Sequence, residues 1–344
     1  MLELNPTRIE ALSKAFCNAR IAVIGDLMLD RYTFGSVSRI SPEAPVPVLE
    51  IEDEQARLGG AANVGHNILG LGAQPLMLGV VGDDTSGLIL KGIFSDLGFP
   101  LDGVVTDPAR PTTVKTRVIA GSQQMLRMDH EMKREIAAET EDRLIGLLED
   151  HIRSLDGIIL EDYNKGVMTR GIIQRATELG NKHGVPVLVD PKSHNFFEYQ
   201  HATVFKPNRK EVEDALGMKM HTAPERVAAG LKLMEMLHAE NVLLTLGELG
   251  MMLFERIPND GIAPEPFQIP TRARDVADVS GAGDTVIATL AVCMACGMSV
   301  RESAVIANRA AGLVIEEVGI VPIYREQLAA ALLEDVENRV TTNE

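Results

Sequence analysis

The amino-acid sequence predicts an α/β protein with a mostly parallel central sheet and helices on both of its faces. Short apolar runs, typical of strands buried on both faces, alternate along the chain with stretches of helical period. A repeated order of helix and strand is typical of a parallel sheet, because each strand needs a crossover before the next one. The composition agrees: 45% of the 344 residues are hydrophobic and none is Trp, which is ample for a large core.

The individual elements follow in chain order. A strand is expected at Ile21–Gly25, where the apolar run IAVIG is closed by glycine. Four further units each pair a helical stretch with a strand-like run. The helical stretches are 61–71, 139–154, 171–183 and 228–237, and the runs that follow them are 75–82, 157–160, 185–190 and 241–247. From Asp284 onward the chain is expected to be mostly helical.

Two segments do not fit this order, and together they predict a small antiparallel sheet inserted as a lid. The segment Pro45–Glu54 begins with alternating proline and apolar residues, as an edge strand does. The segment Thr113–Ala120 alternates apolar residues with Lys115 and Arg117, so one of its faces is expected to be wet. An ordinary hairpin is the alternative. The expected boundaries are a single domain at 1–336, lid segments at about 31–56 and 111–130 within it, and a frayed tail at 337–344.

The charge and the cysteines limit the partners and the compartment. A formal net charge of −16 argues against a nucleic-acid or anionic-membrane partner, because both would repel the chain. The N-terminus lacks the basic residues of a secretory signal and no apolar run is long enough to cross a membrane, so a cytoplasmic protein is expected. Cys17, Cys293 and Cys296 form no disulfide framework. The last two form a CxxC without a second ligand pair for zinc, and are expected to be buried core thiols.

The strongest chemical signal is the segment Asp278–Thr285 (DVSGAGDT), which is followed directly by an apolar helix. Gly281, Ala282 and Gly283 allow the backbone to come close to a ligand, and the first N–H groups of the helix point at the turn. The segment therefore predicts an anion site suited to a phosphoryl group in transfer. Asp284 would repel an anion that only bound there, but it has a role if it accepts a proton from an attacking hydroxyl. An N-capping Asp is the alternative.

Other phosphate-binding and catalytic motifs are missing. There is no Gly-Lys dipeptide, and hence no P-loop, and no G-x-G-x-x-G opens a helix after the first strand. The HRD and DFG motifs of protein kinases are missing, as are the HxGH and HExxH spacings of nucleotidyltransferases and zinc proteases. Phosphoryl transfer by this chain therefore requires another fold.

Four segments, in order along nearly the whole chain, resemble the signatures of the PfkB/ribokinase family. They are Gly59–Asn63 (GGAAN), Asn208–Glu211 (the family's NxxE), Thr245–Gly250 (TLGELG) and Asp278–Thr285 (DVSGAGDT). The resemblance implies a ribokinase-like fold and an ATP-dependent sugar kinase that uses Mg²⁺. One departure is Thr289, where the family usually has Ala or Gly, on the helix beyond the site.

A narrower resemblance concerns the substrate. The segments Gly25–Tyr32 (GDLMLDRY), Arg39–Pro47 (RISPEAPVP) and Glu161–Gly166 (EDYNKG) are similar to those of the D-glycero-β-D-manno-heptose 7-phosphate kinases within the family. This similarity implies transfer of the ATP γ-phosphoryl group to the anomeric hydroxyl, giving the 1,7-bisphosphate for lipopolysaccharide core synthesis. Because the chain has no HxGH, it resembles the form that is not fused to an adenylyltransferase. The alternatives are a PfkB kinase for another phosphosugar or a nucleoside, and a catalytically silent sugar-binding protein on this fold.

The family resemblance also implies roles for single residues. Asp284 corresponds to the base, and the amides of Gly281, Ala282 and Gly283 correspond to the anion hole. The residues that correspond to the sugar-hydroxyl positions are Asp30, Gly59, Gly60 and Asn63. On the ATP side, the resemblance implies that Mg²⁺, through water, and the ATP phosphates are organised by Asn208 and Glu211, and that the nucleotide is lined by Thr245, Gly247 and Asn308. It also implies a monovalent-cation loop that would take K⁺ and that begins with Asp278 and Ser280.

The 7-phosphate of the sugar requires a separate cationic pocket, because the net charge of the chain opposes an anion. The candidates are Lys165, Arg127, Lys115 and Arg117 for the phosphate, and Gln123 and Gln124 for sugar hydroxyls. Lys165 is the first candidate because it belongs to the EDYNKG segment; a solvated surface residue is the alternative for each. The expected partners are therefore the phosphosugar, ATP, and a second copy of the chain bound through the apolar face of the lid sheet.

Overall fold

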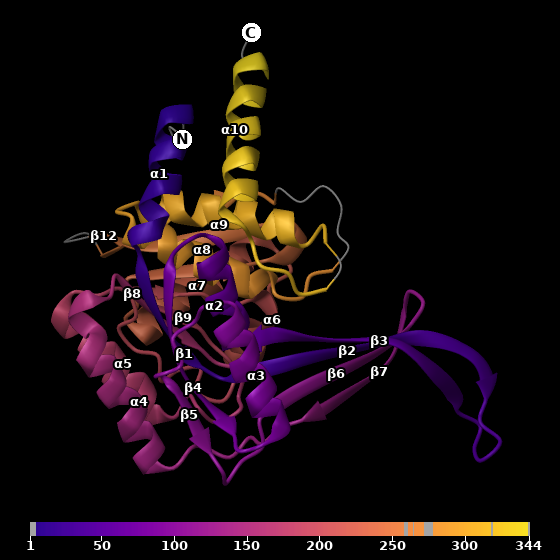
Figure 1. Cartoon of the computed structure of the whole chain (residues 1–344). Coiled ribbons are helices and arrows are strands. Elements are labelled where there is room, and N and C mark those ends of the chain that lie inside the picture. Colours follow the sequence, from indigo (N-terminus) through magenta and orange to yellow (C-terminus); the bar gives the residue numbers. More distant parts are fainter. Residues whose placement is uncertain (1–4, 258–260, 264, 272–277, 318, 343–344) are drawn as a thin grey trace.

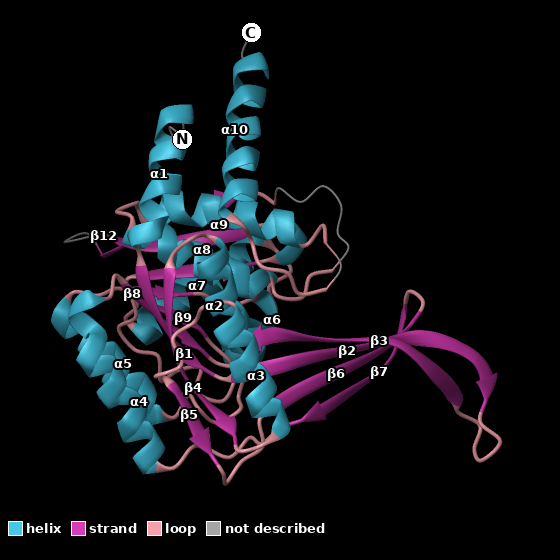
Figure 2. Ribbon diagram, viewed as in Figure 1, coloured by secondary structure: helices cyan, strands magenta, loops and turns pink. Residues whose placement is uncertain are grey.

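The computed structural model describes residues 5–257, 261–263, 265–271, 278–317 and 319–342. These residues form a central sheet between two layers of helices, and a second sheet that projects from this body as an arm (Figures 1 and 2). The strands of the central sheet are β1 (Arg20–Gly25), β4 (Gln74–Gly82), β5 (Val104–Asp107), β8 (Gly157–Glu161), β9 (Val187–Asp190), β10 (Val204–Phe205), β11 (Asn241–Thr245), β12 (Met251–Ile257), β13 (Gly261–Ile262) and β14 (Phe267–Ile269). Their order is β13-β12-β11-β10-β9-β8-β1-β4-β5, with β14 paired to β12.

The central sheet is parallel from β5 to β11, and β12 adds an antiparallel strand at β11. β1 lies in its middle, where Val23 pairs with Met77 of β4 and with Ile159 of β8. All three side chains are fully buried, as expected for strands that are covered on both faces. The predicted α/β class and its mostly parallel sheet are confirmed.

Helices on the two faces of the sheet build two separate cores. Apolar residues of α1, α2, α3, α8, α9 and α10 enter the core on one face, and those of α4, α5, α6 and α7 enter the core on the other. The bounds are α1 (Pro6–Ala15), α2 (Ala61–Gly70), α3 (Thr85–Asp96), α4 (Ala138–His151), α5 (Arg170–His183), α6 (Arg209–Leu216), α7 (Ala223–Leu237), α8 (Ala282–Ala295), α9 (Val300–Val314) and α10 (Arg325–Thr342). No helix in the described part of the chain is both long enough and apolar enough to cross a membrane.

The helix α8 is apolar all round because it lies between the sheet and its neighbouring helices. It begins after Gly281, whose φ of 81° is a left-handed conformation that suits glycine. Cys293 is fully buried in this helix, as predicted. Cys296 is only half-buried, because it is the C-cap residue at which the helix leaves the core; its expected full burial is wrong.

The projecting arm is the predicted lid sheet. Its strands are β2 (Leu27–Ile40), β3 (Pro47–Gly60), β6 (Thr113–Ala120) and β7 (Gln123–His130), in the order β3-β2-β6-β7. The position of β3 at the edge agrees with the prolines that precede it. The sheet is not wholly antiparallel, because β2 and β6 run parallel. The reason is the connection: the chain passes through the β4–α3–β5 part of the body between β3 and β6, instead of turning back through a hairpin.

Two other features differ from the expectation. α10 continues to Thr342, so residues 337–342 of the expected tail belong to this helix, and whether its end frays stays a prediction. The segment from Arg325 to Thr342 contains no Gly or Pro that would stop a helix. α3 was not expected. Asp84 caps it by accepting a hydrogen bond from the Gly87 N–H at 2.7 Å, which satisfies one of the free donors at its start.

Candidate active site

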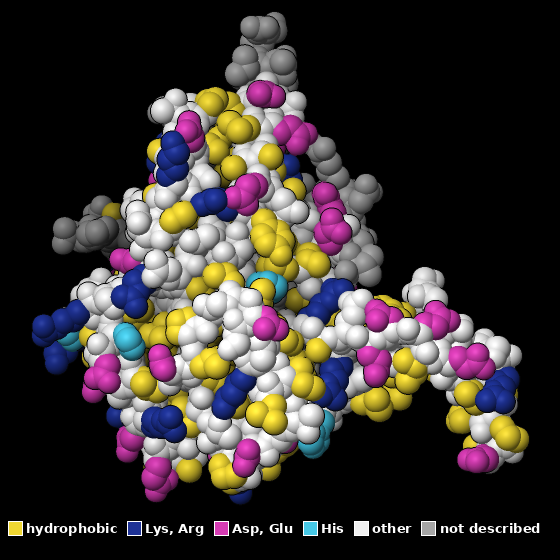
Figure 3. Space-filling model, viewed as in Figure 1, with side chains coloured by type: hydrophobic (Ala, Val, Ile, Leu, Met, Phe, Trp, Pro, Cys, Tyr) yellow, Lys and Arg dark blue, Asp and Glu magenta, His cyan; other side chains and the backbone are white. Residues whose placement is uncertain are grey.

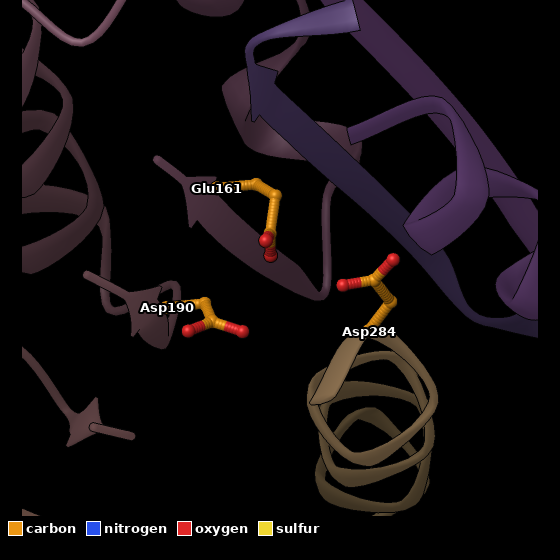
Figure 4. A group of neighbouring side chains, drawn as sticks. All are labelled: Glu161, Asp190 and Asp284. Atoms are coloured by element: carbon orange, nitrogen blue, oxygen red, sulfur yellow. The ribbon is translucent and has the colours of Figure 1, made fainter. Parts of the chain in front are cut away.

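The candidate site lies at the carboxyl ends of β8 and β9, where the first turn of α8 meets the sheet. Open α/β sheets bind ligands in this region, outside the carboxyl ends of the strands. Glu161 is the last residue of β8 and Asp190 is the last residue of β9, while Asp284 lies in the first turn of α8. Figure 4 shows their three carboxylates pointing toward one another from three different elements.

The Asp284 carboxylate is buried and is held at both oxygens. The Asn63 amide donates to Oδ2 at 2.7 Å, and the Tyr163 hydroxyl donates to Oδ1 at 2.7 Å. Burial raises the pKa of Asp284 to about 6, because the two hydrogen bonds and the Lys206 ammonium only partly offset desolvation and the nearby Asp190 charge. Such a carboxyl is ionised at neutral pH and can accept a proton.

The three carboxylates form one group that could hold a divalent cation. One oxygen from each of Glu161, Asp190 and Asp284 lies within 4.8 Å of the others, and all three residues are buried. Neither oxygen of Glu161 has a hydrogen-bond partner among the described residues. Burial, followed by the charges of Asp190 and Asp284, raises the pKa of Glu161 well above its usual range. An oxygen-rich group with an unpartnered carboxylate is chemically suited to a hard cation such as Mg²⁺.

Two lysines partly neutralise this acidic group. The buried Lys206 Nζ lies 2.6 Å from Asp190 Oδ2, and Lys192 Nζ lies 2.5 Å from Glu211 Oε1. Burial alone would lower the pKa of each lysine, but the surrounding carboxylates, Asp190 first, raise it. Both side chains therefore remain charged and place positive charge where phosphate oxygens would need it.

The glycines of the two motifs bring backbone and carboxylates together. A Cβ on Gly59 would lie 2.4 Å from Asp30 Oδ2, and a Cβ on Gly283 would lie 3.5 Å from both Asp190 Oδ2 and Lys206 Nζ. The approach of Asp30 to Gly59 leaves no room for a side chain at position 59. The approach at Gly283 places the start of α8 directly beside the Asp190–Lys206 ion pair. The Ala282 N–H donates to Val279 O at 3.3 Å in this conformation.

Asp30 lies on the inner half of β2, where the lid sheet joins the body. It is buried, and Arg117 Nη1 of β6 lies 2.9 Å from its Oδ1. The Arg117 guanidinium also lies over the Tyr32 ring, 5.2 Å from its centroid. Lys115, two residues earlier on β6, is the cross-strand neighbour of Asp30. The structure therefore brings Asp30 and two of the predicted basic residues together.

The loop after β8 carries Tyr163 and Lys165 into the same region. The buried Asp26 carboxylate accepts hydrogen bonds from the backbone N–H groups of Tyr163, Lys165 and Val167 at 2.9, 2.9 and 3.1 Å. The Lys165 ammonium lies 2.8 Å from Glu131 Oε2, and its side chain is 13% exposed. Burial lowers the pKa of Lys115. The Asp30 carboxylate opposes this effect by raising the pKa, and the neighbouring Lys165 charge lowers it further.

Four of the predicted nucleotide-side residues, at positions 208, 211, 245 and 247, lie in neighbouring segments, and the fifth contacts a different part of the chain. Asn208 caps α6 by accepting from the Glu211 N–H at 2.9 Å, and Glu211 Oε2 accepts from the Asn208 N–H at 2.8 Å, which completes a capping box. The backbones of Thr245 and Asn208 form an isolated parallel β-bridge. Gly247 begins the turn that follows, with a left-handed φ of 61°. Asn308 of α9 donates to Pro270 O at 2.8 Å.

Other predicted residues lie at the margins of this group. The Asp278 carboxylate accepts from the Ser280 and Gly319 N–H groups at 2.9 and 3.2 Å, so it organises the turn before α8. Arg127 is exposed on β7 and pairs with Asp129 at 2.9 Å. Gln124 is exposed next to the β6–β7 turn, at the end of this hairpin that lies away from Asp30.

Several residues of the site were missed by the sequence analysis as functional residues. Glu161 and Asp190 each close an apolar strand run, which is a usable signal because ligand sites lie at the carboxyl ends of parallel strands. Lys206 directly follows β10 and precedes the NxxE segment, so it carried the same signal. Nothing in the sequence pattern indicated that Tyr163 is a neighbour of Asp284. Nor did it indicate that Lys192 is a neighbour of Glu211.

Comparison with known sequences places this site in a family. Residues 18–324 match the model of the pfkB family carbohydrate kinases. The chain is 41% identical over 317 residues to the "Bifunctional protein HldE" of Desulfatibacillum aliphaticivorans, and 43% identical over 311 residues to that of Pelobacter propionicus. These matches cover 92% and 90% of this chain but only 64% and 62% of the relatives. The chain thus spans less than two thirds of the length of the curated relatives it matches.

Solved structures show the same fold. The ribokinase of Arabidopsis thaliana, complexed with ribose and ATP, superposes with a TM-score of 0.71 over 91% of this chain and 98% of its own, at 22% identity. Phosphofructokinase-2 from Escherichia coli, in complex with potassium, gives a TM-score of 0.72 over 91% and 99%, at 18% identity. The ribokinase-like fold and its inserted sheet are thereby confirmed. The chain belongs to the pfkB family of carbohydrate kinases and is an ATP-dependent sugar kinase.

Proposed function

We propose that the kinase transfers the γ-phosphoryl group of ATP to the anomeric hydroxyl of D-glycero-β-D-manno-heptose 7-phosphate, giving the 1,7-bisphosphate for ADP-heptose and lipopolysaccharide core synthesis. The observation that carries the choice of a phosphosugar is a group of three cations: Lys115 and Arg117 lie next to Asp30, and Lys165 lies near Lys115. In a chain with a net charge of −16, three cations next to the expected sugar position suit a substrate that brings its own phosphate.

The residues of this chain account for the transfer step. Asp284 accepts the proton of the attacking hydroxyl, and its two hydrogen bonds hold the carboxylate in one orientation. The amides of Gly281, Ala282 and Gly283, at the start of α8, would supply the anion hole at the positive end of the helix. The Ala282 N–H, which donates to Val279 O in this structure, would have to turn from that carbonyl to the group in transfer. Asp30, Gly59, Gly60 and Asn63 surround the sugar side. A loose phosphoryl-transfer transition state requires alignment and neutralised charge more than a strong base.

Mg²⁺ is the divalent cation that we propose for the site. The carboxylates of Glu161 and Asp190, and the NxxE carboxylate of Glu211 acting through water, would hold it, because hard oxygen donors are the ligands that Mg²⁺ prefers. When bound, the ion supplies positive charge that neutralises phosphate oxygens. Asn208, Thr245, Gly247 and Asn308 line the proposed ATP side, and Asp278 with Ser280 begins the proposed K⁺ loop.

Glu211→Gln is expected to raise the Mg²⁺ concentration needed for half-maximal rate, because the variant loses a charge that orders the metal's water shell. Glu161→Gln is expected to weaken binding of Mn²⁺ to the nucleotide-free protein, because an amide cannot lose a proton to become the anionic oxygen ligand that this unpartnered carboxyl can supply. The measurements are a rate titration with free Mg²⁺ and calorimetry with Mn²⁺. The exposed Glu139→Gln serves as the control. An unchanged Mg²⁺ titration for Glu211→Gln removes that residue from the metal site.

The substrate proposal is tested by ADP release with a panel of acceptors. The panel contains the heptose 7-phosphate, the same heptose without its phosphate, fructose 6-phosphate, ribose and adenosine. The proposal expects the highest kcat/KM for the heptose 7-phosphate and a large loss when its phosphate is missing, because binding energy of a remote dianion can align the reacting hydroxyl. A higher kcat/KM for ribose, adenosine or fructose 6-phosphate contradicts it.

We also propose that the kinase is a homodimer joined through the lid sheet. Leu126, Met128 and Ile51 are 53%, 49% and 62% exposed. Strand register places them on the face of the sheet opposite to Asp30 and Tyr32, and Figure 3 shows hydrophobic side chains along the projecting arm. An apolar face of this kind favours a protein partner, and a second copy of the same sheet matches its apolar character.

Replacing Leu126 and Met128 by Glu is expected to convert the dimer into a monomer. The two introduced carboxylates would be buried in an apolar interface that offers them no cation or hydrogen-bond donor. Light scattering after gel filtration measures the mass. Met236→Glu is a matched control, because Met236 is 41% exposed on α7 of the body. A wild-type protein that is a monomer at micromolar concentration, or a double variant that stays dimeric, contradicts the proposal.

A further inference from the structure

The segment that follows the lid strand β7 places a carboxylate on the cation that is the first candidate for the phosphate of the sugar. Glu131 directly follows β7, and its Oε2 lies 2.8 Å from Lys165 Nζ. We propose that Glu131 holds the phosphate position in the enzyme without substrate, and that the phosphate monoester of the substrate takes its place when the sugar binds. The inference rests on the proposed function, because it takes Lys165 as a phosphate ligand.

The ion pair is largely withdrawn from water, but charge alone holds it. The side chains of Lys165 and Glu131 are only 13% and 15% exposed. Despite the short distance, Glu131 Oε2 has no hydrogen-bond partner of regular geometry among the described residues. The other oxygen lies 3.9 Å from the ammonium of Lys133, whose side chain is 73% exposed. The carboxylate can therefore leave this position without breaking a network of directed hydrogen bonds.

Glu131 also acts on the second lysine of the proposed phosphate site. Burial lowers the pKa of Lys115, and three carboxylates raise it, those of Asp30, Asp129 and Glu131. The first two are each paired with an arginine, at 2.9 Å. Glu131 is the member of this set whose ion pair is with a lysine of the proposed phosphate site. Its charge is therefore shared by the two cations that a bound phosphate would contact.

The backbone near Glu131 is anchored to the loop of Lys165 by other bonds. Arg110 Nη2 donates to Arg134 O at 3.1 Å and also to Lys165 O. The Ile136 N–H adds a bond to the same loop at 2.9 Å. None of these bonds uses the Glu131 carboxylate, so its side chain can turn away by rotation about its own bonds while both backbones stay in place.

The exchange of one anion for another favours the phosphate. A phosphate monoester carries a charge of about −1.5 to −2 near pH 7 and three acceptor oxygens, which is more than a carboxylate offers. The displaced Glu131 returns to water and regains its hydration, which offsets part of the ion pair that it gives up. Before the substrate binds, the carboxylate spares two partly buried lysines the cost of lacking a counter-ion. A sugar without a phosphate has no group that can make this exchange.

Glu131→Gln is expected to strengthen binding of the heptose 7-phosphate by about three- to ten-fold, because the apparent affinity is the intrinsic affinity multiplied by the fraction of molecules whose ammonium is free. Inorganic phosphate, as a probe of the pocket alone, should gain in the same direction, and the heptose without its phosphate should not. Calorimetry without ATP measures the three constants at one ionic strength, because salt screens such contacts. A carboxylate that only orients Lys165 gives the opposite sign.

Glu135→Gln is the matched control, because Glu135 is exposed on the same segment and its replacement removes the same charge from the chain. It should leave all three constants unchanged. Glu131→Asp keeps the net charge but shortens the side chain, so it should give a smaller gain of the same sign, and it replaces Glu131→Gln if that variant does not fold. In the Lys165→Ala background, Glu131→Gln should give no gain.

The outcomes separate this inference from the proposed function. The exchange is overturned by unchanged or weaker phosphate binding in the folded Glu131 variant, by an equal gain in Glu135→Gln, or by a gain that persists in the Lys165→Ala background. Each of these results overturns it even if the heptose 7-phosphate is the best acceptor of the panel. A better acceptor contradicts the proposed function instead, and the binding of inorganic phosphate then still decides the role of Glu131.

Discussion

Asp284→Asn is expected to reduce kcat by at least about a hundred-fold while ATP and sugar still bind. General-base catalysis contributes about 10²–10⁴-fold, and the amide cannot accept the proton. The surroundings of Asp284 are suited to an amide of the same size. The Asn63 amide can donate to the new carbonyl oxygen, and the Tyr163 hydroxyl can accept from the new NH₂ group as well as donate.

Folding should survive this change, because the variant removes a buried negative charge from beside Glu161 and Asp190. Stopped-flow or ADP-release kinetics give kcat, calorimetry gives the two binding constants, and thermal unfolding checks the fold. The loss is expected in kcat and not in the binding constants. More than about a tenth of the wild-type kcat in a folded variant would show that Asp284 is not the base.

Lys165→Ala is expected to lower kcat/KM for the heptose 7-phosphate by about one to two powers of ten. A charge-assisted hydrogen bond is worth roughly 1.5–3 kcal/mol, and each 1.4 kcal/mol is a factor of about ten. Lys165 is suited to this contact because its loop is fixed by Asp26 and its ammonium is mostly buried near Lys115. Its present partner is Glu131 at 2.8 Å, so the phosphate would have to displace that carboxylate or share the ammonium with it.

The comparison of two sugars makes this prediction specific. Lys165→Ala should affect the heptose without a 7-phosphate far less than the phosphosugar. Arg127→Ala is the control for a nearby cation, because Arg127 pairs with Asp129 and its side chain is 53% exposed; its effect should be small. Equal losses on both sugars for Lys165→Ala would remove it from the phosphate site, and a larger selective loss for Arg117→Ala would move that site to β6.

Local sequence patterns determined several elements of the fold, among them β1, β8 and α8, and the position of the proposed base. The apolar runs at Ile21–Gly25 and 157–160 became β1 and β8 because a strand buried on both faces is apolar at every position. The DVSGAGDT segment predicted a turn followed by a helix, and α8 begins within it at Ala282. These features depend on residues that are neighbours in sequence, so the sequence was sufficient for them.

The tertiary structure alone decided which side chains meet at the site. Glu161, Asp190 and Asp284 are separated by 29 and 94 positions in the numbering, and they converge because β8 and β9 are neighbours in the sheet and α8 begins beside their ends. The contact between Tyr163 and Asp284 depends in addition on a loop that is held by Asp26, the residue between β1 and β2. The parallel pairing of β2 with β6 likewise follows from how the chain crosses the body. Periodicity describes one element at a time, whereas contacts of this kind depend on strand order and packing across the whole chain.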